Sequence, residues 1–266
     1  MNRLQDKVAL IIGADSRDNM GQDIARRFVA EGARVVVAGR NVEEMSRFAD
    51  EIKGSHFLCD ITCKTELAAL TAHVLAWGGA LDIAVNTAGW GLARGFLETT
   101  EDELEKITAL QFKGPFLFFQ TVIEAMPCGG SIIQISSATT QAVIENYAAY
   151  IGTKAGVDHV LRCVANEFGS RGIRVNSISP GLTETPMTAE ALATPGVREC
   201  FVGRYPLGRI GTKADIAAAA VWLASDECFM SGENLQINGG LQLRGNPTSA
   251  DVGAAVEKAL AAKASA

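Results

Sequence analysis

Tyr150 and Lys154 form a pair of side chains suited to proton transfer. They stand four residues apart, so within a helix they lie on the same face. A free phenol has a pKa of about 10 and is a poor base at neutral pH, but a neighbouring ammonium favours its phenolate form. Lys154 is therefore expected to activate Tyr150 for acid–base chemistry. An amphipathic helix whose lysine stem lies along apolar surface would show the same pair.

The elements that position this pair follow from a strict alternation of two patterns. Short apolar, β-branched segments predict strands covered on both faces, and amphipathic segments predict helices between them. Such alternation predicts an α/β fold with a doubly wound parallel sheet in three α/β/α layers, a Rossmann fold. Strands are expected at 7–12, 34–38, 56–58, 81–85, 131–135, 173–178 and 234–237. Helices are expected at 21–31, 42–52, 64–77, 101–126, 147–170 and 213–225.

One domain is expected over residues 1–245, because no Pro- or Ser-rich linker and no charge block divides the 266 residues, of which 48% are apolar. Residues 246–266 are rich in Ala and Lys, with Val252, Val256 and Leu260 at helical spacing. This tail is either a short helix, docked on the body or on a partner subunit, or a frayed end.

The amino-acid composition limits the kinds of partner and site that the chain is expected to have. A net charge of −6 disfavours binding to nucleic acid. No apolar run reaches the 18 residues that suggest a membrane span. The six cysteines are scattered without a CxxC pair, as expected for reduced thiols in a cytoplasmic protein. The three histidines show no ligand spacing, so no metal site is predicted.

The loop from Gly13 to Gly21 follows the first strand and opens the first helix. Gly13 permits a sharp exit from the strand, and Gly21 permits a close approach of the helix. The helix N-terminus then offers amide groups and a positive dipole end to a pyrophosphate. A plain turn is the alternative for this glycine-rich segment.

The end of the second strand bears on the choice of cofactor. An acidic residue there would accept hydrogen bonds from a ribose 2′-hydroxyl and favour NAD, but the sequence reads Ala38-Gly39-Arg40-Asn41. Arg40 suits a 2′-phosphate, and Arg17 adds a second positive group. NADP is therefore predicted, with NAD as the alternative. Arg40 could also simply stand at the start of a solvent-exposed helix, and it would then bind no ligand.

Further motifs follow the expected strands in a fixed order, and together they resemble a known family. They are Asn86-Thr87-Ala88-Gly89, Ser136-Ser137, Tyr150-Ile151-Gly152-Thr153-Lys154, Asn176-Ser177-Ile178-Ser179-Pro180-Gly181 and Asn238-Gly239-Gly240. Over residues 5 to about 243 the chain resembles a short-chain dehydrogenase/reductase. The resemblance implies a nicotinamide cofactor, hydride transfer to or from an alcohol or carbonyl, and a homotetramer.

The resemblance also implies roles for single residues. Ser137, which precedes Tyr150 by 13 residues, would orient a carbonyl and stabilise charge on its oxygen. Tyr150 would donate the proton in reduction, and Lys154 would also reach the cofactor ribose. Gln111 stands where the family usually has an asparagine that anchors a proton-relaying water; a longer amide forms the same bond types, so Gln111 is either part of that relay or structural.

The cofactor contacts follow from the loop, from Arg40 and from the resemblance. Asp60 would bond the adenine or, alternatively, cap the next helix, and Thr185 would contact the nicotinamide carboxamide. The full set is Gly13, Ser16, Arg17, Asn19, Met20, Gly21, Arg40, Asn41, Asp60, Ile61, Asn86, Ala88, Gly89, Tyr150, Lys154, Pro180, Gly181, Leu182, Thr183 and Thr185.

The glycine loop departs from the family pattern. It is two residues longer than in most members, with Asn19 at the middle glycine position, and this spacing resembles bacterial enoyl-acyl-carrier reductases. Tyr147, seven residues before Lys154, matches the acting tyrosine of those proteins. Ser137 and Tyr150 nevertheless favour chemistry on a ketone or secondary alcohol. The alternatives are an enoyl-thioester reductase and a non-catalytic nucleotide-binding regulator.

A substrate lid is expected at about residues 186–206, where apolar side chains are combined with Gly196 and Gly203 as hinges. With Trp90 and Phe96 nearby, the pocket is expected to be mainly apolar. No cluster of Arg or Lys calls for a multiply anionic substrate. The prediction is a medium-sized apolar ketone or alcohol, including an aromatic or cyclic one.

Overall fold

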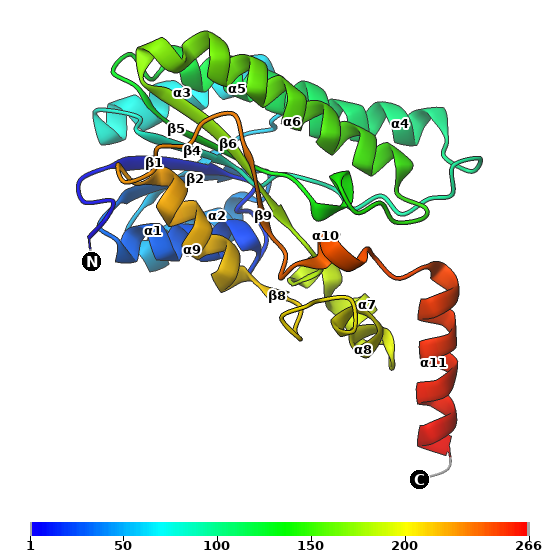
Figure 1. Ribbon diagram of the computed structural model, residues 1–266. Helices are drawn as coiled ribbons and strands as arrows, with labels where there is room; N and C mark the ends of the chain where they lie inside the picture. Colours follow the sequence, from blue (N-terminus) through cyan, green and yellow to red (C-terminus); the bar gives the residue numbers. More distant parts are fainter. Residues whose placement is uncertain (1, 265–266) are drawn as a thin grey trace.

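The computed structural model describes residues 2–264, and they fold as three layers (Figure 1). The central parallel sheet has the order β3-β2-β1-β4-β5-β6-β9, which confirms the predicted doubly wound fold. All seven predicted strands are present, with ends that differ by at most two residues. They are β1 (Val8–Ile12), β2 (Arg34–Gly39), β3 (Ser55–Leu58), β4 (Ile83–Asn86), β5 (Gly130–Ile135), β6 (Ile173–Pro180) and β9 (Asn234–Ile237).

Helices cover both faces because the side chains of each strand alternate between two cores. From β1, Ile11 enters one core, and Leu10 and Ile12 enter the other. Burying a side chain of this size contributes about 1.5–3 kcal/mol, so both helical layers are held to the sheet. The first core packs under α1 (Met20–Ala30), α2 (Val42–Ile52) and α9 (Lys213–Ala224), and the second under α3 (Lys64–Gly78), α5 (Gly114–Glu124) and α6 (Ala148–Phe168).

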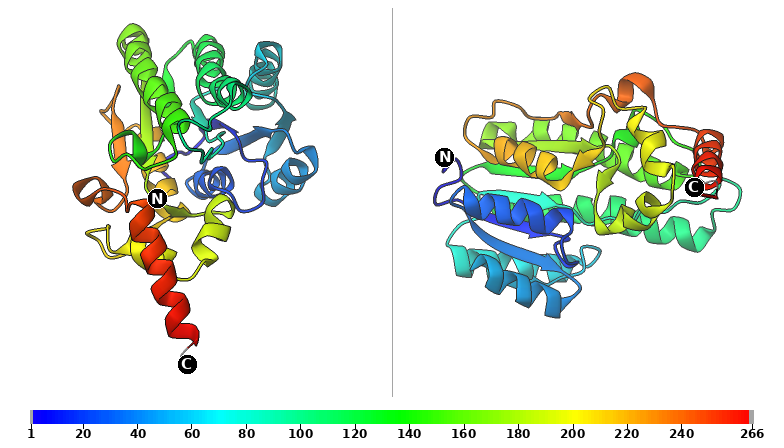
Figure 2. Two further views of the ribbon diagram at one scale, coloured as in Figure 1. Left: turned by 90° about the vertical axis from the view of Figure 1, so that its right-hand side faces the viewer. Right: turned by 90° about the horizontal axis from the view of Figure 1, so that it is seen from below.

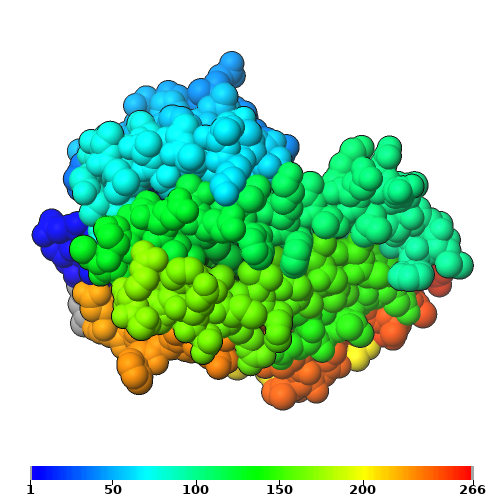
Figure 3. Space-filling view, turned by 90° about the horizontal axis from the view of Figure 1, so that it is seen from above, coloured from blue at the N-terminus to red at the C-terminus, as the bar shows by residue number. Residues whose placement is uncertain are grey.

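The helix predicted over residues 101–126 is wrong as a single element. The structure divides it into α4 (Glu101–Thr108), a π-helical turn η1 (Ala109–Lys113) and α5. A local cause is Pro115, which has no N–H to offer the carbonyl of Gln111 four residues earlier. Such wide turns occur often at functional sites, and this one carries the buried Gln111. In Figure 3, α5 and α6 form a continuous face, and the residues around 100 project at one end.

Short elements lie beyond the carboxyl ends of the strands. The predicted lid consists of η4 (Pro186–Thr188), α7 (Ala189–Ala193) and α8 (Val197–Val202), above a small parallel pair, β7 (Thr183–Glu184) and β8 (Gly211–Thr212). The tail is helical rather than irregular. After α10 (Leu241–Arg244), α11 (Ser249–Ala264) contacts α8 and stands away from the sheet (Figure 2).

The sheet topology places a crevice where ligands bind in such folds. Connections leave β1 in one direction, toward β2 and β3, and β4 pairs on the opposite side of β1. Ligands bind beyond the carboxyl ends of the strands at this switch point. None of the helices within residues 2–264 is both long enough and apolar enough to cross a membrane.

Candidate active site

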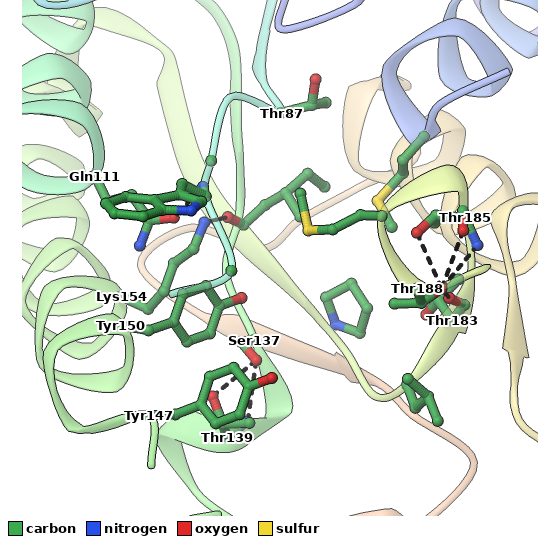
Figure 4. Close-up of a pocket in the computed structure, with 18 of the residues that line it drawn as sticks. Thr87, Gln111, Ser137, Thr139, Tyr147, Tyr150, Lys154, Thr183, Thr185 and Thr188 are labelled. Atoms are coloured by element: carbon green, nitrogen blue, oxygen red, sulfur yellow. Dashed lines mark hydrogen bonds between the residues drawn. The ribbon is translucent and has the colours of Figure 1, made fainter. Parts of the chain in front are cut away.

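A cavity of about 900 Å³ opens beyond the carboxyl ends of the strands. Its lining comes from the glycine loop, the ends of the central strands, the start of α6, the lid and the tail. Figure 4 shows Tyr147, Tyr150 and Lys154 on one side, with Thr183, Thr185 and Thr188 across the space. The sequence-predicted group Ser137, Gln111, Tyr150 and Lys154 therefore lines one pocket.

Ser137, Tyr150 and Lys154 converge although they come from two elements. Ser137 follows β5, and its Oγ accepts hydrogen bonds from the backbone N–H (3.2 Å) and the hydroxyl (2.8 Å) of Thr139. With both of these donors turned toward it, the Ser137 hydroxyl keeps its own proton for another acceptor, and its interaction with the neighbouring Tyr150 hydroxyl favours the phenolate. One turn further along α6, the Nζ of Lys154 donates to the carbonyl of Ile135 at 2.8 Å and lies 5.9 Å from the centre of the Tyr150 ring.

Burial dominates the electrostatics of this group. Desolvation raises the pKa of Tyr150, and the hydrogen bond with Ser137 opposes that rise without cancelling it. Desolvation also lowers the pKa of Lys154 to about 8, partly opposed by the charge of Asp158. The sequence predicts that Lys154 favours the phenolate of Tyr150; in this structure the cost of burying the phenolate is larger.

Asp158 is a buried carboxyl that the sequence analysis did not single out. It lies one turn beyond Lys154 on α6 and accepts hydrogen bonds from the hydroxyls of Ser136 (2.6 Å) and Ser177 (2.9 Å) and from the amide of Asn234 (2.6 Å). Burial raises its pKa, against those hydrogen bonds and the charge of Lys154. Ser177 and Asn234 belong to β6 and β9, so the partners of Asp158 come together only through the sheet.

Gln111 joins three elements at the wall of the pocket. Its Oε1 accepts from the backbone N–H of Trp90 at 2.8 Å, and its Nε2 donates to the hydroxyl of Thr153 at 3.0 Å. The side chain is almost wholly buried. Both ends of the amide are engaged in holding the β4 loop and α6 to the π-helical turn.

Gln111→Asn is expected to lower the free energy of unfolding by about 1–2 kcal/mol, because an amide one methylene shorter cannot keep both bonds and leaves a buried group without a partner. Turnover is expected to persist. Urea unfolding of the two proteins measures the first effect and initial rates the second. An unchanged stability would show that the neighbouring segments close around the shorter side chain.

The glycine loop fits the N-terminus of α1 against the neighbouring strand. Gly13 has φ +93°, and a Cβ there would lie 2.5 Å from the backbone nitrogen of Ala88. A Cβ on Gly21 would lie 2.7 Å from the hydroxyl of Thr87. Asn19, which replaces the usual middle glycine, caps the helix by accepting from the N–H of Gln22 at 3.0 Å. The loop thus keeps the helix N-terminus at the cavity, as binding of a pyrophosphate requires.

The far end of the cavity carries three charged side chains, on Asp15, Arg40 and Asp60. Asp60 accepts from the N–H and the hydroxyl of Thr62, both at 2.8 Å. Burial alone would raise its pKa, but these bonds and the charge of Arg40 lower it. Asp60 does not cap the next helix, because the N-cap of α3 is Cys63.

Thr188 orders the opposite end of the cavity, beside Thr183 and Thr185. Its hydroxyl donates to the carbonyl of Thr183 at 2.6 Å and accepts from the N–H of Thr185 at 3.1 Å. The predicted lid begins at this turn, so its first residues are tied to β7. The family resemblance identified Thr183 and Thr185 but gave no signal for Thr188, whose role depends on folding back over both.

Most predicted cofactor residues line this cavity, which reaches from the charged end and the glycine loop to Tyr150. The cavity residues are Gly13, Ser16, Asn19, Met20, Gly21, Arg40, Asp60, Ile61, Ala88, Gly89, Tyr150, Lys154, Pro180, Gly181, Leu182, Thr183 and Thr185. Sequence reasoning missed other parts of the lining, including Asp15, Cys59, Thr87, Ile144, Asn146, Thr188, Asn246, Pro247, Ser249 and Val252. Within residues 2–264, no three His, Cys, Asp or Glu side chains form a group suited to a metal ion.

Three predicted cofactor residues do not line the cavity. Arg17 is exposed on the outside of the glycine loop. Asn41 caps α2 by accepting from the N–H of Glu44 at 3.2 Å. Asn86 is fully buried and accepts from the N–H of Ala88 at 3.0 Å, so it shapes the end of β4 from behind. The expectation for Phe96 is also wrong, because its side chain is 78% exposed and outside the pocket.

Comparisons with known proteins agree with this fold. A family profile described as enoyl-(acyl carrier protein) reductase matches residues 13–242. D-threitol dehydrogenase of Mycolicibacterium smegmatis is 34% identical over 91% of this chain and 95% of its own length. Trans-4-hydroxycyclohexanecarboxylate dehydrogenase of Sinomonas cyclohexanicum is 36% identical over 90% and 94%. A solved short-chain type dehydrogenase/reductase from Mycobacterium ulcerans has 29% identity and a TM-score of 0.89, covering 97% of this chain and 98% of that one.

Proposed function

The chain belongs to the short-chain dehydrogenase/reductase family, and from this premise we propose that it interconverts a secondary alcohol and a ketone with Tyr150 as the proton-transferring group. The observation that carries the proposal is the convergence of Ser137, Tyr150 and Lys154 in a cavity that also contains the glycine loop at the N-terminus of α1. A nicotinamide cofactor, when bound, accepts or supplies the hydride.

Three side chains of the protein position the substrate and transfer the proton. The hydroxyl of Ser137, fixed by Thr139, orients the substrate oxygen and stabilises charge that develops on it. The Tyr150 hydroxyl gives its proton to that oxygen in reduction and takes it back in oxidation. Lys154, held by the carbonyl of Ile135, places a positive charge beside Tyr150. Because the phenol is buried, its proton is held until the substrate oxygen becomes basic.

The substrate is proposed to be medium-sized and apolar, with a cyclic alcohol or ketone as the first candidate. Trp90, Met187, Val197 and Phe201 supply apolar walls to the cavity. Two relatives support this class of substrate. One is the Sinomonas cyclohexanicum protein, and the other is a 7alpha-hydroxysteroid dehydrogenase from Escherichia coli, which is 33% identical over 90% of this chain. The name of each specifies a hydroxylated substrate. An alicyclic ring fits the same apolar lining.

The cofactor is a nicotinamide dinucleotide, and the charged residues at the far end of the cavity bear on whether it is NAD or NADP. The sequence predicts NADP from Arg40 and Arg17. Arg40 lines the cavity, whereas Arg17 lies outside it. The carboxylate of Asp15 accepts the backbone N–H of Arg40. A carboxylate favours the ribose 2′-hydroxyl of NAD, whereas a guanidinium favours the 2′-phosphate of NADP. The homotetramer and the cytoplasmic location also stay predictions; exposed Phe112 and Phe116 on the outer face of η1 and α5 support self-association.

Enoyl-thioester reduction is the second candidate, because Tyr147 also lines the pocket. The rings of Tyr147 and Tyr150 meet edge to face, with their centres 5.9 Å apart. The description of the matching family profile points the same way. The interaction of Ser137 and the proximity of Lys154, however, favour Tyr150 as the working phenol and a carbonyl as the substrate.

The test is a rate screen of cyclic secondary alcohols and their ketones, following the absorbance of reduced nicotinamide with NAD and NADP separately. Turnover of a cyclic alcohol or ketone is expected. A 2-enoyl thioester belongs in the same screen. Saturation of the thioester without ketone or alcohol turnover would replace the first candidate with the second, and dinucleotide binding without any turnover would favour the regulator.

A further inference from the structure

Asp15 lies where the family places its ribose-binding acid. That position is at the end of β2, where this chain has Gly39 and no side chain. A Cβ built on Gly39 would lie 2.5 Å from the Cβ of Asp15 and 2.7 Å from its Oδ2. The side chain of Asp15 therefore fills the space that a side chain at residue 39 would occupy. The sequence conceals this substitution, because the two positions are 24 residues apart.

The carboxylate of Asp15 is fixed by the backbone and keeps acceptor capacity for a ligand. Its Oδ2 accepts the N–H of Arg40 at 2.7 Å, and the residue lines the cavity. Among residues 2–264, neither the side chain of Asp15 nor that of Arg40 forms an ion pair. By contrast, Asp18 in the same loop pairs with Arg26 at 3.1 Å. A carboxylate has about four acceptor sites, and the bond from Arg40 uses one.

The geometry points to Asp15 as the residue that selects the dinucleotide, so we propose that this chain binds NAD(H) in preference to NADP(H). The proposal rests on the proposed function for the presence of a nicotinamide cofactor. A fixed carboxylate accepts hydrogen bonds from the 2′- and 3′-hydroxyls of a ribose. It repels a 2′-phosphate, and the nearby carboxylate of Asp60 adds to that repulsion. The charge of Arg40, which acts on Asp60, offsets part of this repulsion.

Fluorescence titration of NADH and NADPH against the purified protein tests the proposal without substrate. The native protein is expected to bind NADH more tightly. Asp15→Asn keeps an acceptor for the N–H of Arg40 but removes the charge. It is expected to move the ratio of dissociation constants toward NADPH by about 10- to 100-fold, the range that one charge-assisted hydrogen bond supplies. Asp15→Ser is a second variant, and the melting temperature of each reports on folding.

Asp18→Asn is the matched control, because it makes the same charge change in the same loop, outside the cavity. Its ratio is expected to equal that of the native protein. Two outcomes overturn the selectivity proposal: tighter binding of NADPH than of NADH by the native protein, or a native ratio of dissociation constants in Asp15 variants that fold. Neither outcome affects the proposed dehydrogenase activity. Failure of both NADH and NADPH to bind would instead refute the proposed function.

Discussion

Tyr150→Phe is expected to lower kcat for ketone reduction by roughly 10²- to 10⁴-fold, the contribution of a positioned general acid or base. The variant loses only the hydroxyl that meets Ser137, and the ring remains packed near Lys154. Binding of the dinucleotide is therefore expected to change little. Initial rates at saturating cofactor, with a parallel fluorescence titration, separate the two effects.

Tyr147→Phe provides the reciprocal control for this experiment. Tyr147 lines the same cavity and meets Tyr150 edge to face, so the variant removes a phenol hydroxyl from the same region and leaves Tyr150 in place. Little loss of ketone reduction is expected from this variant. The reverse outcome, a large loss from Tyr147→Phe and a small one from Tyr150→Phe, would assign the proton to Tyr147 and support enoyl chemistry.

The fold was predictable because each element carries its own signal. β9 is the half-buried edge strand of the sheet, and its alternating apolar side chains, Leu235 and Ile237, pack against the core, so its bounds coincide with those predicted. The turn η1 was not predictable in this way, since its residues suit an α-helix and only the missing N–H of Pro115 and the contacts of Gln111 favour the wider turn. Local patterns thus predict elements well and their interruptions poorly.

The candidate site divides along the same line. Tyr150 and Lys154 are one helical turn apart, so sequence spacing alone brings them together. Asp15 and Asp158 gain their importance from residues far away in sequence, on β2 for Asp15 and on β6 and β9 for Asp158. Spacing also says nothing about desolvation, which is why the expected lowering of the Tyr150 pKa is not what the structure shows. Charge and burial at the site required the assembled fold.

Lys154→Met is expected to lower kcat by about 10- to 1000-fold, the effect of losing the one to three pKa units that an adjacent opposite charge provides. Methionine is unbranched and fills a similar path through the core, but it places no charge beside Tyr150. With the phenol already buried, the remaining hydroxyl is a weaker acid, so the loss is expected to be largest at low pH in the oxidation direction, where Tyr150 must act as a base. A pH profile of kcat in both directions measures it.

The same variant is expected to be more stable than the native protein at neutral pH. The pKa of Lys154 is about 8 in the folded protein against 10.5 for the free side chain, so below pH 8 the folded state carries the full cost of a buried ammonium. At 1.36 kcal/mol per unit, the shift corresponds to roughly 3 kcal/mol, from which the lost bond to Ile135 subtracts. Between pH 8 and 10.5, Lys154 is deprotonated in the folded protein but still protonated in the unfolded chain. The stability of the native protein therefore rises with pH in this range, and the advantage of the variant shrinks. Thermal melts at pH 7 and pH 10 measure this difference. A variant that is less stable at both values, with kcat unchanged, would make Lys154 a structural residue rather than one retained for chemistry at the expense of stability.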